Sequence, residues 1–209
     1  MKLVVFGATG GTGRCILEVA LAAGHDVLAL ARKPEAIPLR DHLAIQPGDV
    51  LDAGDVASAV QGADAVLSAF GPANNRQPGT LMSRGAANIV AGCTEHGVHR
   101  LVFESGLMCS DGAELGWASR LAVKLFGGLY HALRDDKRLA EQVIMASALD
   151  YVIVRPPVLS HDPARGDYQH GAGIAVRAAA KLPHGDVADF MVKCAVDPTV
   201  ARTVQNIGR

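Results

Sequence analysis

The sequence predicts an α/β fold: a single domain, residues 1–209, built on a doubly wound parallel sheet. An apolar, strand-like run over residues 2–6 leads through a glycine-rich turn into a stretch with helical spacing. Strand-like and helix-like stretches then alternate along the chain, which is typical of parallel strands joined by helices. A chain of 209 residues is also long enough to bury a substantial core within one domain.

Short apolar runs that stop at turn-forming residues define the strands. The third run, for example, ends at Pro47-Gly48-Asp49, and the sixth ends at Pro156-Pro157. In chain order, these runs predict strands over residues 2–6, 25–31, 43–46, 65–71, 99–105 and 151–154. A last run over residues 203–207 predicts an edge strand.

The stretches between the strands carry apolar residues at helical spacing, as Leu81, Ala86, Ile89 and Cys93 do. This spacing predicts helices over residues 15–21, 52–61, 80–96, 117–133, 137–147 and 186–194. Residues 160–173 are rich in Gly, His and Asp, which indicates irregular chain. We expect the segment from about 157 to 209 to add a small substrate-pocket elaboration to the domain.

The glycine-rich turn predicts a dinucleotide site. Its spacing is Gly7-x-x-Gly10-x-x-Gly13, between a strand and a helix. Gly7 allows the sharp turn, Gly10 lets the backbone approach a pyrophosphate, and Gly13 lets the helix pack close to the strand. The free N–H groups at the start of the helix would hold the anion. The fold is therefore expected to be of the Rossmann type, although a glycine-rich turn can also be purely structural.

The residues that follow the second strand favour NADP(H) over NAD(H). An NAD-selective site has an acidic residue there, but Arg32 stands nineteen residues after Gly13 and Lys33 follows it. A guanidinium can grip a 2′-phosphate that a carboxylate would repel. Asp26 lies at the wrong end of the strand to bind the ribose. We expect Arg32 to be the main residue that binds the 2′-phosphate. Lys33 or Arg14 would either assist it or simply be exposed to solvent.

Other strand exits should complete the site, because ligands bind outside the carboxyl ends of the strands in such sheets. Asp49 is placed to accept a hydrogen bond from the adenine amine and Val50 to pack on the ring, although Asp49 can instead cap the following turn. Ser105 follows the fifth strand, where it could orient the nicotinamide amide or the acceptor, or cap the exit loop.

Composition excludes several classes of function. The 20 Lys and Arg residues balance 21 Asp and Glu residues, so nothing favours nucleic acid or an anionic membrane as a partner. No uncharged apolar run reaches the ~20 residues that span a bilayer. The four cysteines are scattered and no His lies at metal-ligand spacing, so we expect reduced thiols, a cytoplasmic location and no metal.

Several motifs together resemble those of atypical short-chain dehydrogenase/reductases of the NAD(P)-binding, NmrA-like kind. The motifs are Gly7–Gly13, Gly48-Asp49-Val50, Ala63-Asp64-Ala65-Val66 and the run from Ala148 to Pro156. Within this family the chain is most similar to the flavin reductase and biliverdin reductase branch. That similarity spans nearly the whole chain and includes Met82-Ser83, His96-Gly97-Val98, Asp135-Asp136 and Pro156-Pro157.

The resemblance implies a full set of cofactor contacts. With the charged neighbours above, the set is Gly7, Thr9, Gly10, Gly11, Thr12, Gly13, Arg14, Arg32, Lys33, Asp49, Val50, Phe70, Gly71, Met82, Ser105, Pro156, Pro157 and Val158. Two departures remove polar groups near the substrate. Relatives of the mammalian type have His where this chain has Val158, and Arg where it has Ala73.

The residues that carry proton chemistry in ordinary short-chain dehydrogenases are only partly present. Lys137 occupies the place of the Lys in their Tyr-x-x-x-Lys pair, but the Tyr position is Leu133. Tyr130 lies seven residues before Lys137, about two helical turns away, so spacing alone does not let it replace that Tyr. Lys137 can also be a plain surface lysine, and His161 and His170 can be proton donors or solvated loop histidines.

These observations favour an NADPH-dependent reductase that transfers hydride to a conjugated acceptor such as a flavin, bilin or quinone. Such a reaction needs mainly positioning and a dry, flat pocket. Ser105 and Lys137 are the expected catalytic residues, in a monomer or small homo-oligomer. The alternative is a non-catalytic module that binds NADP(H) and senses redox state.

Overall fold

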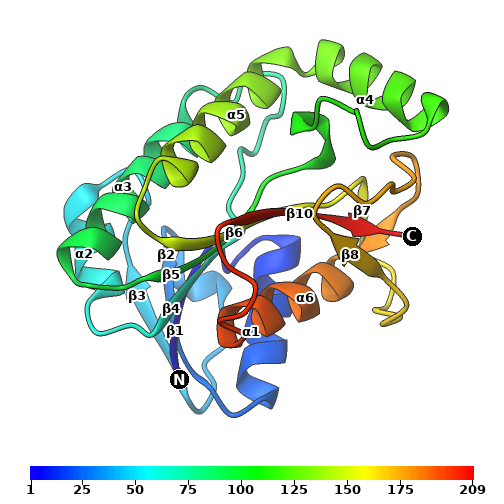
Figure 1. Ribbon diagram of the computed structural model, residues 1–209. Coiled ribbons are helices and arrows are strands. Elements are labelled where there is room, and N and C mark those ends of the chain that lie inside the picture. Colours follow the sequence, from blue (N-terminus) through cyan, green and yellow to red (C-terminus); the bar gives the residue numbers. More distant parts are fainter.

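The computed structural model describes all 209 residues as three layers (Figure 1). An eight-stranded sheet lies between two sets of helices. One face carries α2 (Ala53–Val60), α3 (Leu81–Glu95) and α5 (His131–Met145), and the other carries α1 (Gly11–Ala22) and α6 (His184–Val196). This arrangement confirms the Rossmann-type, doubly wound single domain predicted from the sequence.

The strand order of the main sheet is β3-β2-β1-β4-β5-β6-β10-β8. All neighbouring strands are parallel except β10 and β8, which are antiparallel. The order reverses at β1, which pairs with both β2 and β4, so the crevice for a ligand is expected beside it. The strands are β1 (Lys2–Phe6), β2 (Asp26–Ala31), β3 (Leu43–Pro47), β4 (Ala65–Ser68), β5 (Arg100–Glu104), β6 (Asp150–Arg155), β8 (Gln169–Gly171) and β10 (Thr203–Gly208).

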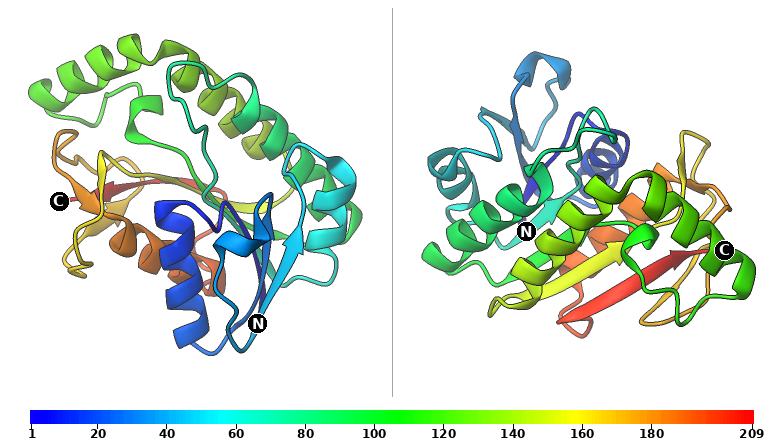
Figure 2. Two further views of the ribbon diagram at one scale, coloured as in Figure 1. Left: turned by 180° about the vertical axis from the view of Figure 1, so that it is seen from behind. Right: turned by 90° about the horizontal axis from the view of Figure 1, so that it is seen from above.

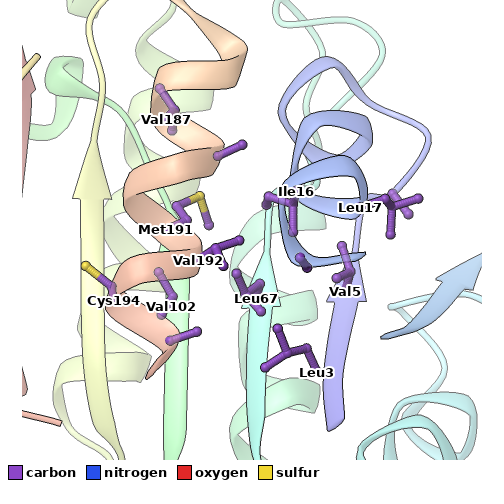
Figure 3. Packing of buried hydrophobic residues seen from close by; sticks show 14 of the residues in the cluster. Leu3, Val5, Ile16, Leu17, Leu67, Val102, Val187, Met191, Val192 and Cys194 are labelled. Carbon is purple, nitrogen blue, oxygen red and sulfur yellow. The ribbon is translucent and has the colours of Figure 1, made fainter. Parts of the chain in front are cut away.

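Alternate residues of the central strands fill two separate cores. Leu3 and Val5 of β1 pack with α1 and α6, where Ile16 and Met191 meet them (Figure 3). Val4 and Phe6 of the same strand belong to the core under α2, α3 and α5. Because both faces of the sheet are covered, its inner strands are mostly apolar, as expected of a parallel sheet, with Arg100 and Glu104 at the two ends of β5 as buried charged exceptions.

The long helical stretch before β6 divides at a different place from the one predicted. α4 (Trp117–Leu129) ends and α5 begins around Tyr130, whose φ of −115° and ψ of 41° leave the helical region. The break follows Gly127 and Gly128, two residues of low helix propensity. Residues 131–145 therefore form one helix, and Leu133 and Lys137 lie one turn apart on it. Figure 1 shows α4 extending beyond α5 over the C-terminal strands.

Two predictions about the C-terminal part were wrong. β10 is not an edge strand, because β8 pairs with its outer side; Figure 2 shows β10 running beside β6. The segment over residues 160–173 is not wholly irregular, because it begins at β7 (Leu159–Ser160) and contains β8. β7 pairs with β9 (Leu182–Pro183) in a second, two-stranded sheet. Such short strands form through backbone bonds, so no apolar pattern signals them.

Two short 3₁₀ turns complete the chain, η1 (Pro34–Ala36) after β2 and η2 (Leu107–Cys109) after β5. None of the helices combines the length and the apolar character that crossing a membrane requires.

Candidate cofactor and acceptor site

Two cavities open at the carboxyl edge of the parallel sheet. The smaller, of about 150 Å³, lies at the ends of β1, β2 and β4, where the strand order reverses. The larger, of about 330 Å³, lies at the ends of β5 and β6, under α4 and α5. A ligand that spans both would follow the edge of the sheet across the neighbouring strands β4 and β5.

The glycine turn forms one wall of the smaller cavity. Gly7 has a φ of +83°, a conformation that other residues rarely adopt. A Cβ atom on Gly13 would lie 2.0 Å from the carbonyl oxygen of Gly7, so only glycine allows α1 to start this close to β1. No side chain caps the start of α1, and the first N–H groups of the helix have no partner within the protein. These free donors are suited to an anion.

The positive residues near this turn have different surroundings. Arg32 lines the smaller cavity and forms no ion pair. Lys33 is exposed and lies outside both cavities, while the Arg14 Nε donates to the Thr9 carbonyl oxygen at 3.1 Å. Asp26 begins β2, at the opposite edge of the sheet, where it pairs with a histidine. Arg32 is thus the charged group of this cavity that is free to bind a phosphate.

The far wall of the smaller cavity consists of Asp49, Val50, Phe70 and Gly71. Asp49 does cap the turn that follows it, because its Oδ1 accepts the N–H of Leu51 at 3.0 Å. No protein donor bonds to its second oxygen, so the same carboxylate can also accept a bond from a ligand. Apolar rings and side chains beside free donors and a free guanidinium fit the adenosine and phosphates of NADP(H).

The larger cavity is mostly apolar and collects side chains from distant parts of the chain. Pro156, Pro157 and Val158 follow β6, whereas Phe126 and Leu133 come from α4 and α5. Met108 lines it as well, but Trp117 points into solvent with 82% of its surface exposed. Apolar walls of this kind suit a ligand with few polar groups.

Ser105 and Lys137, the predicted catalytic residues, meet in the larger cavity. The Lys137 Nζ donates to the Ser105 carbonyl oxygen at 2.5 Å. The Ser105 hydroxyl donates to the Cys109 sulfur at 3.5 Å, and its N–H donates to the Val154 carbonyl oxygen at 2.8 Å. Ser105 is thus held by β6 and by Cys109 of the loop after β5, and Lys137 is held by Ser105. Leu133 lies one turn before Lys137, where a Tyr would stand.

Tyr130 also lines the larger cavity, although its spacing from Lys137 did not predict this. The spacing would place Tyr130 two turns from Lys137 only if both residues lay on one continuous helix. The chain instead bends at Tyr130, between α4 and α5. Its ring stacks on Phe126, with the ring centroids 5.9 Å apart. Only a prediction of the break between α4 and α5 would have placed the Tyr130 phenol at the site.

Two residues that sequence reasoning missed lie behind the glycine turn, and both meet Thr12. Thr12 is buried, and its hydroxyl donates to the Glu104 Oε1 at 3.1 Å and lies 2.9 Å from the His184 Nδ1. Gly11 leaves room for His184, because a Cβ there would lie 2.5 Å from the His184 Nε2. The Thr12 hydroxyl therefore faces inward, and only its N–H faces a ligand at the start of α1. No sequence motif signals this contact between β5, α1 and α6.

Met82 is the remaining expected contact, and it lies in neither cavity. Its side chain is fully buried in the core, and its N–H donates to the Asp136 carboxylate at 2.8 Å. The neighbouring Leu81 lines the smaller cavity instead.

Comparisons with known proteins agree with this geometry. Residues 7–198 match the model of a family described as NAD(P)H-binding. An uncharacterised chloroplast protein of Arabidopsis thaliana is 33% identical over 175 residues, which cover 79% of this chain and 62% of that protein. The chain thus spans less than two thirds of the length of this relative.

Two solved structures share the whole fold. ChuY from Escherichia coli O157:H7, named as an anaerobilin reductase, superposes with a TM-score of 0.80 and 27% identity over 100% of this chain and 97% of its own. A short-chain dehydrogenase/reductase from Veillonella parvula in complex with NADP has a TM-score of 0.81 and 20% identity, and covers 100% of this chain and 94% of its own.

Proposed function

This chain belongs to the NAD(P)H-binding family, and from that premise we propose that it is an NADPH-dependent reductase of a flavin, bilin or quinone. One observation carries the proposal. A polar cavity with free helix donors and an unpaired Arg32 adjoins an apolar cavity that holds Ser105 and Lys137, at one edge of the sheet.

The smaller cavity would bind the adenosine end of the cofactor. The N–H groups of α1 would hold the pyrophosphate, and Arg32 would hold the 2′-phosphate. Asp49 and Val50 would contact the adenine. When bound, NADPH supplies a hydride, and its nicotinamide would lie beside Ser105 and Pro156. Lys137 would fix the exit loop of β5 through its bond to the Ser105 carbonyl oxygen.

The larger cavity supports a conjugated acceptor. Its mostly apolar walls would exclude water from a bound planar molecule, and Leu133 stands where ordinary short-chain dehydrogenases have the phenol for carbonyl reduction. A structure of similar fold is named as an anaerobilin reductase, which supports a bilin-like acceptor for this chain too. With this function we expect a cytoplasmic monomer or small homo-oligomer.

The test is the oxidation of NADPH and of NADH with FMN, riboflavin, biliverdin and a small quinone as acceptors. We expect saturable turnover with NADPH, much weaker turnover with NADH, and one best acceptor class. Tight NADPH binding without turnover of any acceptor would contradict the proposal and favour the redox-sensing module instead. Preference for NADH would contradict the role of Arg32.

A further inference from the structure

A buried carboxyl group lines the larger cavity and has no ion-pair partner. Glu104 is the last residue of β5, is 8% exposed, and lines the larger cavity. Its carboxyl accepts one side-chain hydrogen bond, from the Thr12 hydroxyl at 3.1 Å. Burying a charge without a partner is costly, so a carboxyl at such a position is often kept for a function.

The hydrogen bond to Thr12 continues toward the surface. The Thr12 oxygen lies 2.9 Å from the His184 Nδ1, and the His184 ring centroid lies 4.8 Å from that of His161, which is exposed. Three side chains form this series of contacts: Glu104 from β5, Thr12 from α1 and His184 from α6. We call the series the Glu104 relay. The relay thus connects the solvent near His161, on the face of the sheet covered by α1 and α6, with the larger cavity under α4 and α5.

We propose that Glu104 donates the proton that accompanies hydride transfer to the acceptor, and that Thr12 and His184 return a proton to it from solvent. The inference rests on the proposed reductase function. It adds a catalytic residue and narrows the acceptors to those that gain a proton on oxygen or nitrogen when they are reduced.

The step balances in atoms and charge. When NADPH is bound it would supply a hydride, and a quinone or carbonyl acceptor that takes this hydride would hold two more electrons and a negative oxygen. The Glu104 O–H bond breaks, the proton moves to that oxygen, and Glu104 becomes a carboxylate. The Thr12 hydroxyl then passes its proton to Glu104 and takes one from the His184 Nδ1, while the His184 Nε2 takes a proton from water. Exchange of the His184 ring protons with water then restores the Nδ1–H tautomer and the starting state of the relay.

The charges around Glu104 fit an acid that works near neutral pH. Burial raises the pKa of Glu104 to about 7, although Lys137 on α5 and the bond from Thr12 on α1 oppose the shift. On α6, burial and the neighbouring His161 lower the pKa of His184, which favours the neutral ring that can give a proton from one nitrogen while it takes one at the other. On β6, Arg155 is paired with Glu141 and leaves Glu104 without a strong cation.

The main test compares Glu104→Gln with wild type, using a quinone and FMN as acceptors. Loss of a general acid lowers turnover by about 100-fold, so we expect that loss with the quinone. FMN accepts hydride into a delocalised ring that tolerates the charge, so its turnover should fall far less. Wild-type turnover with the quinone should decline as the pH rises through about 7, and the variant should lose that decline.

Matched variants distinguish the relay from the remaining polar groups of the cavity. Thr12→Val keeps the N–H of α1 but removes the hydroxyl, and should lower quinone turnover less than Glu104→Gln does; Thr12→Ser should restore it. Tyr130→Phe tests the phenol of the cavity and should leave the pH profile in place. The NADPH affinity of each variant, measured by fluorescence titration, shows that the cofactor still binds.

A readout without turnover tests the protonation directly. Carbon-13 NMR of labelled glutamate carboxyls should show one group that titrates near pH 7 in wild type and is missing from Glu104→Gln. The proposal is overturned if that signal titrates near 4.5, the ordinary value, or if Glu104→Gln keeps wild-type quinone turnover. If wild type reduces no acceptor while the signal titrates near 7, the reductase function fails and Glu104 is not its proton donor.

Discussion

The two cavities at the edge of the sheet are built in different ways. The smaller is formed mainly by the ends of β1 to β4 and the first residues after them, and its lining includes four glycines, Gly7, Gly10, Gly48 and Gly71. The larger collects side chains from residue 75 to residue 179, mostly from helices and loops. The contrast indicates that dinucleotide binding depends on local turns near the N-terminus. In the proposed reductase, the choice of acceptor would depend instead on how distant segments pack.

The largest expected effect is at the glycine turn, on which the smaller cavity depends. A Cβ atom in Gly13→Ala would lie 2.0 Å from the Gly7 carbonyl oxygen, which is rigid backbone. We expect the variant to lose about 3 kcal/mol or more of stability, together with NADPH binding. Gly128→Ala is the control, because nothing lies within 4 Å of its Cβ in α4. Chemical denaturation of both variants measures the difference, and equal stability would refute the close approach.

Glu104, in the larger cavity, should make the free energy of unfolding depend on pH. Its pKa rises from 4.5 to about 7 on folding, so between these values the folded chain holds a proton that the unfolded chain has lost. The free energy of unfolding should fall by up to about 3 kcal/mol as the pH rises across this window, and then level off. Urea unfolding at pH 5 and pH 8 tests this. In Glu104→Gln, the free energy of unfolding should fall less between these two pH values, because the contribution of Glu104 is gone. An identical fall in the variant would mean that other groups cause the pH dependence.

Arg32 tests whether the smaller cavity selects the cofactor. Arg32→Asp should weaken NADPH binding by about 100-fold, because a charge-assisted bond is replaced by repulsion, while NADH binding should hold or improve. Fluorescence titration with both cofactors measures the preference. Lys33→Ala serves as the comparison, since Lys33 lies outside the cavity and should change little. An unchanged preference in Arg32→Asp would remove Arg32 from the site.

The smallest effect is expected at the mouth of the larger cavity. Val158 is 39% exposed there, where relatives of the mammalian type carry His. Val158→His should change kcat/KM for biliverdin by roughly two- to tenfold, the size of one net hydrogen bond, and should change NADPH affinity less than that. A larger change in NADPH affinity than in kcat/KM would mean that Val158 serves the cofactor and not the acceptor.

The same contrast explains what sequence alone could predict. The strand, turn and helix around Gly7 and Gly13 are contiguous, so their spacing indicated both the fold and the anion-binding turn. The position of Arg32 followed from the end of the second strand. These are local relations, and the doubly wound sheet that they predict is confirmed.

The rest depended on packing that no local pattern records. Tyr130 reaches the larger cavity because the helix breaks beside it, and the contact between Thr12 and Glu104 joins residues 92 positions apart. His184 meets them from a third element. The strand expected at the edge of the sheet, β10, is an inner strand because β8 pairs with it through backbone bonds.

The most direct test of a shared reductase site is a crystal structure of the wild-type protein with NADP⁺ and the best acceptor. We predict the 2′-phosphate on Arg32, the pyrophosphate at the start of α1, and the nicotinamide beside Ser105 with the acceptor in the larger cavity. A nicotinamide outside that cavity, or an acceptor bound away from it, would contradict the claim that the two cavities form one reductase site.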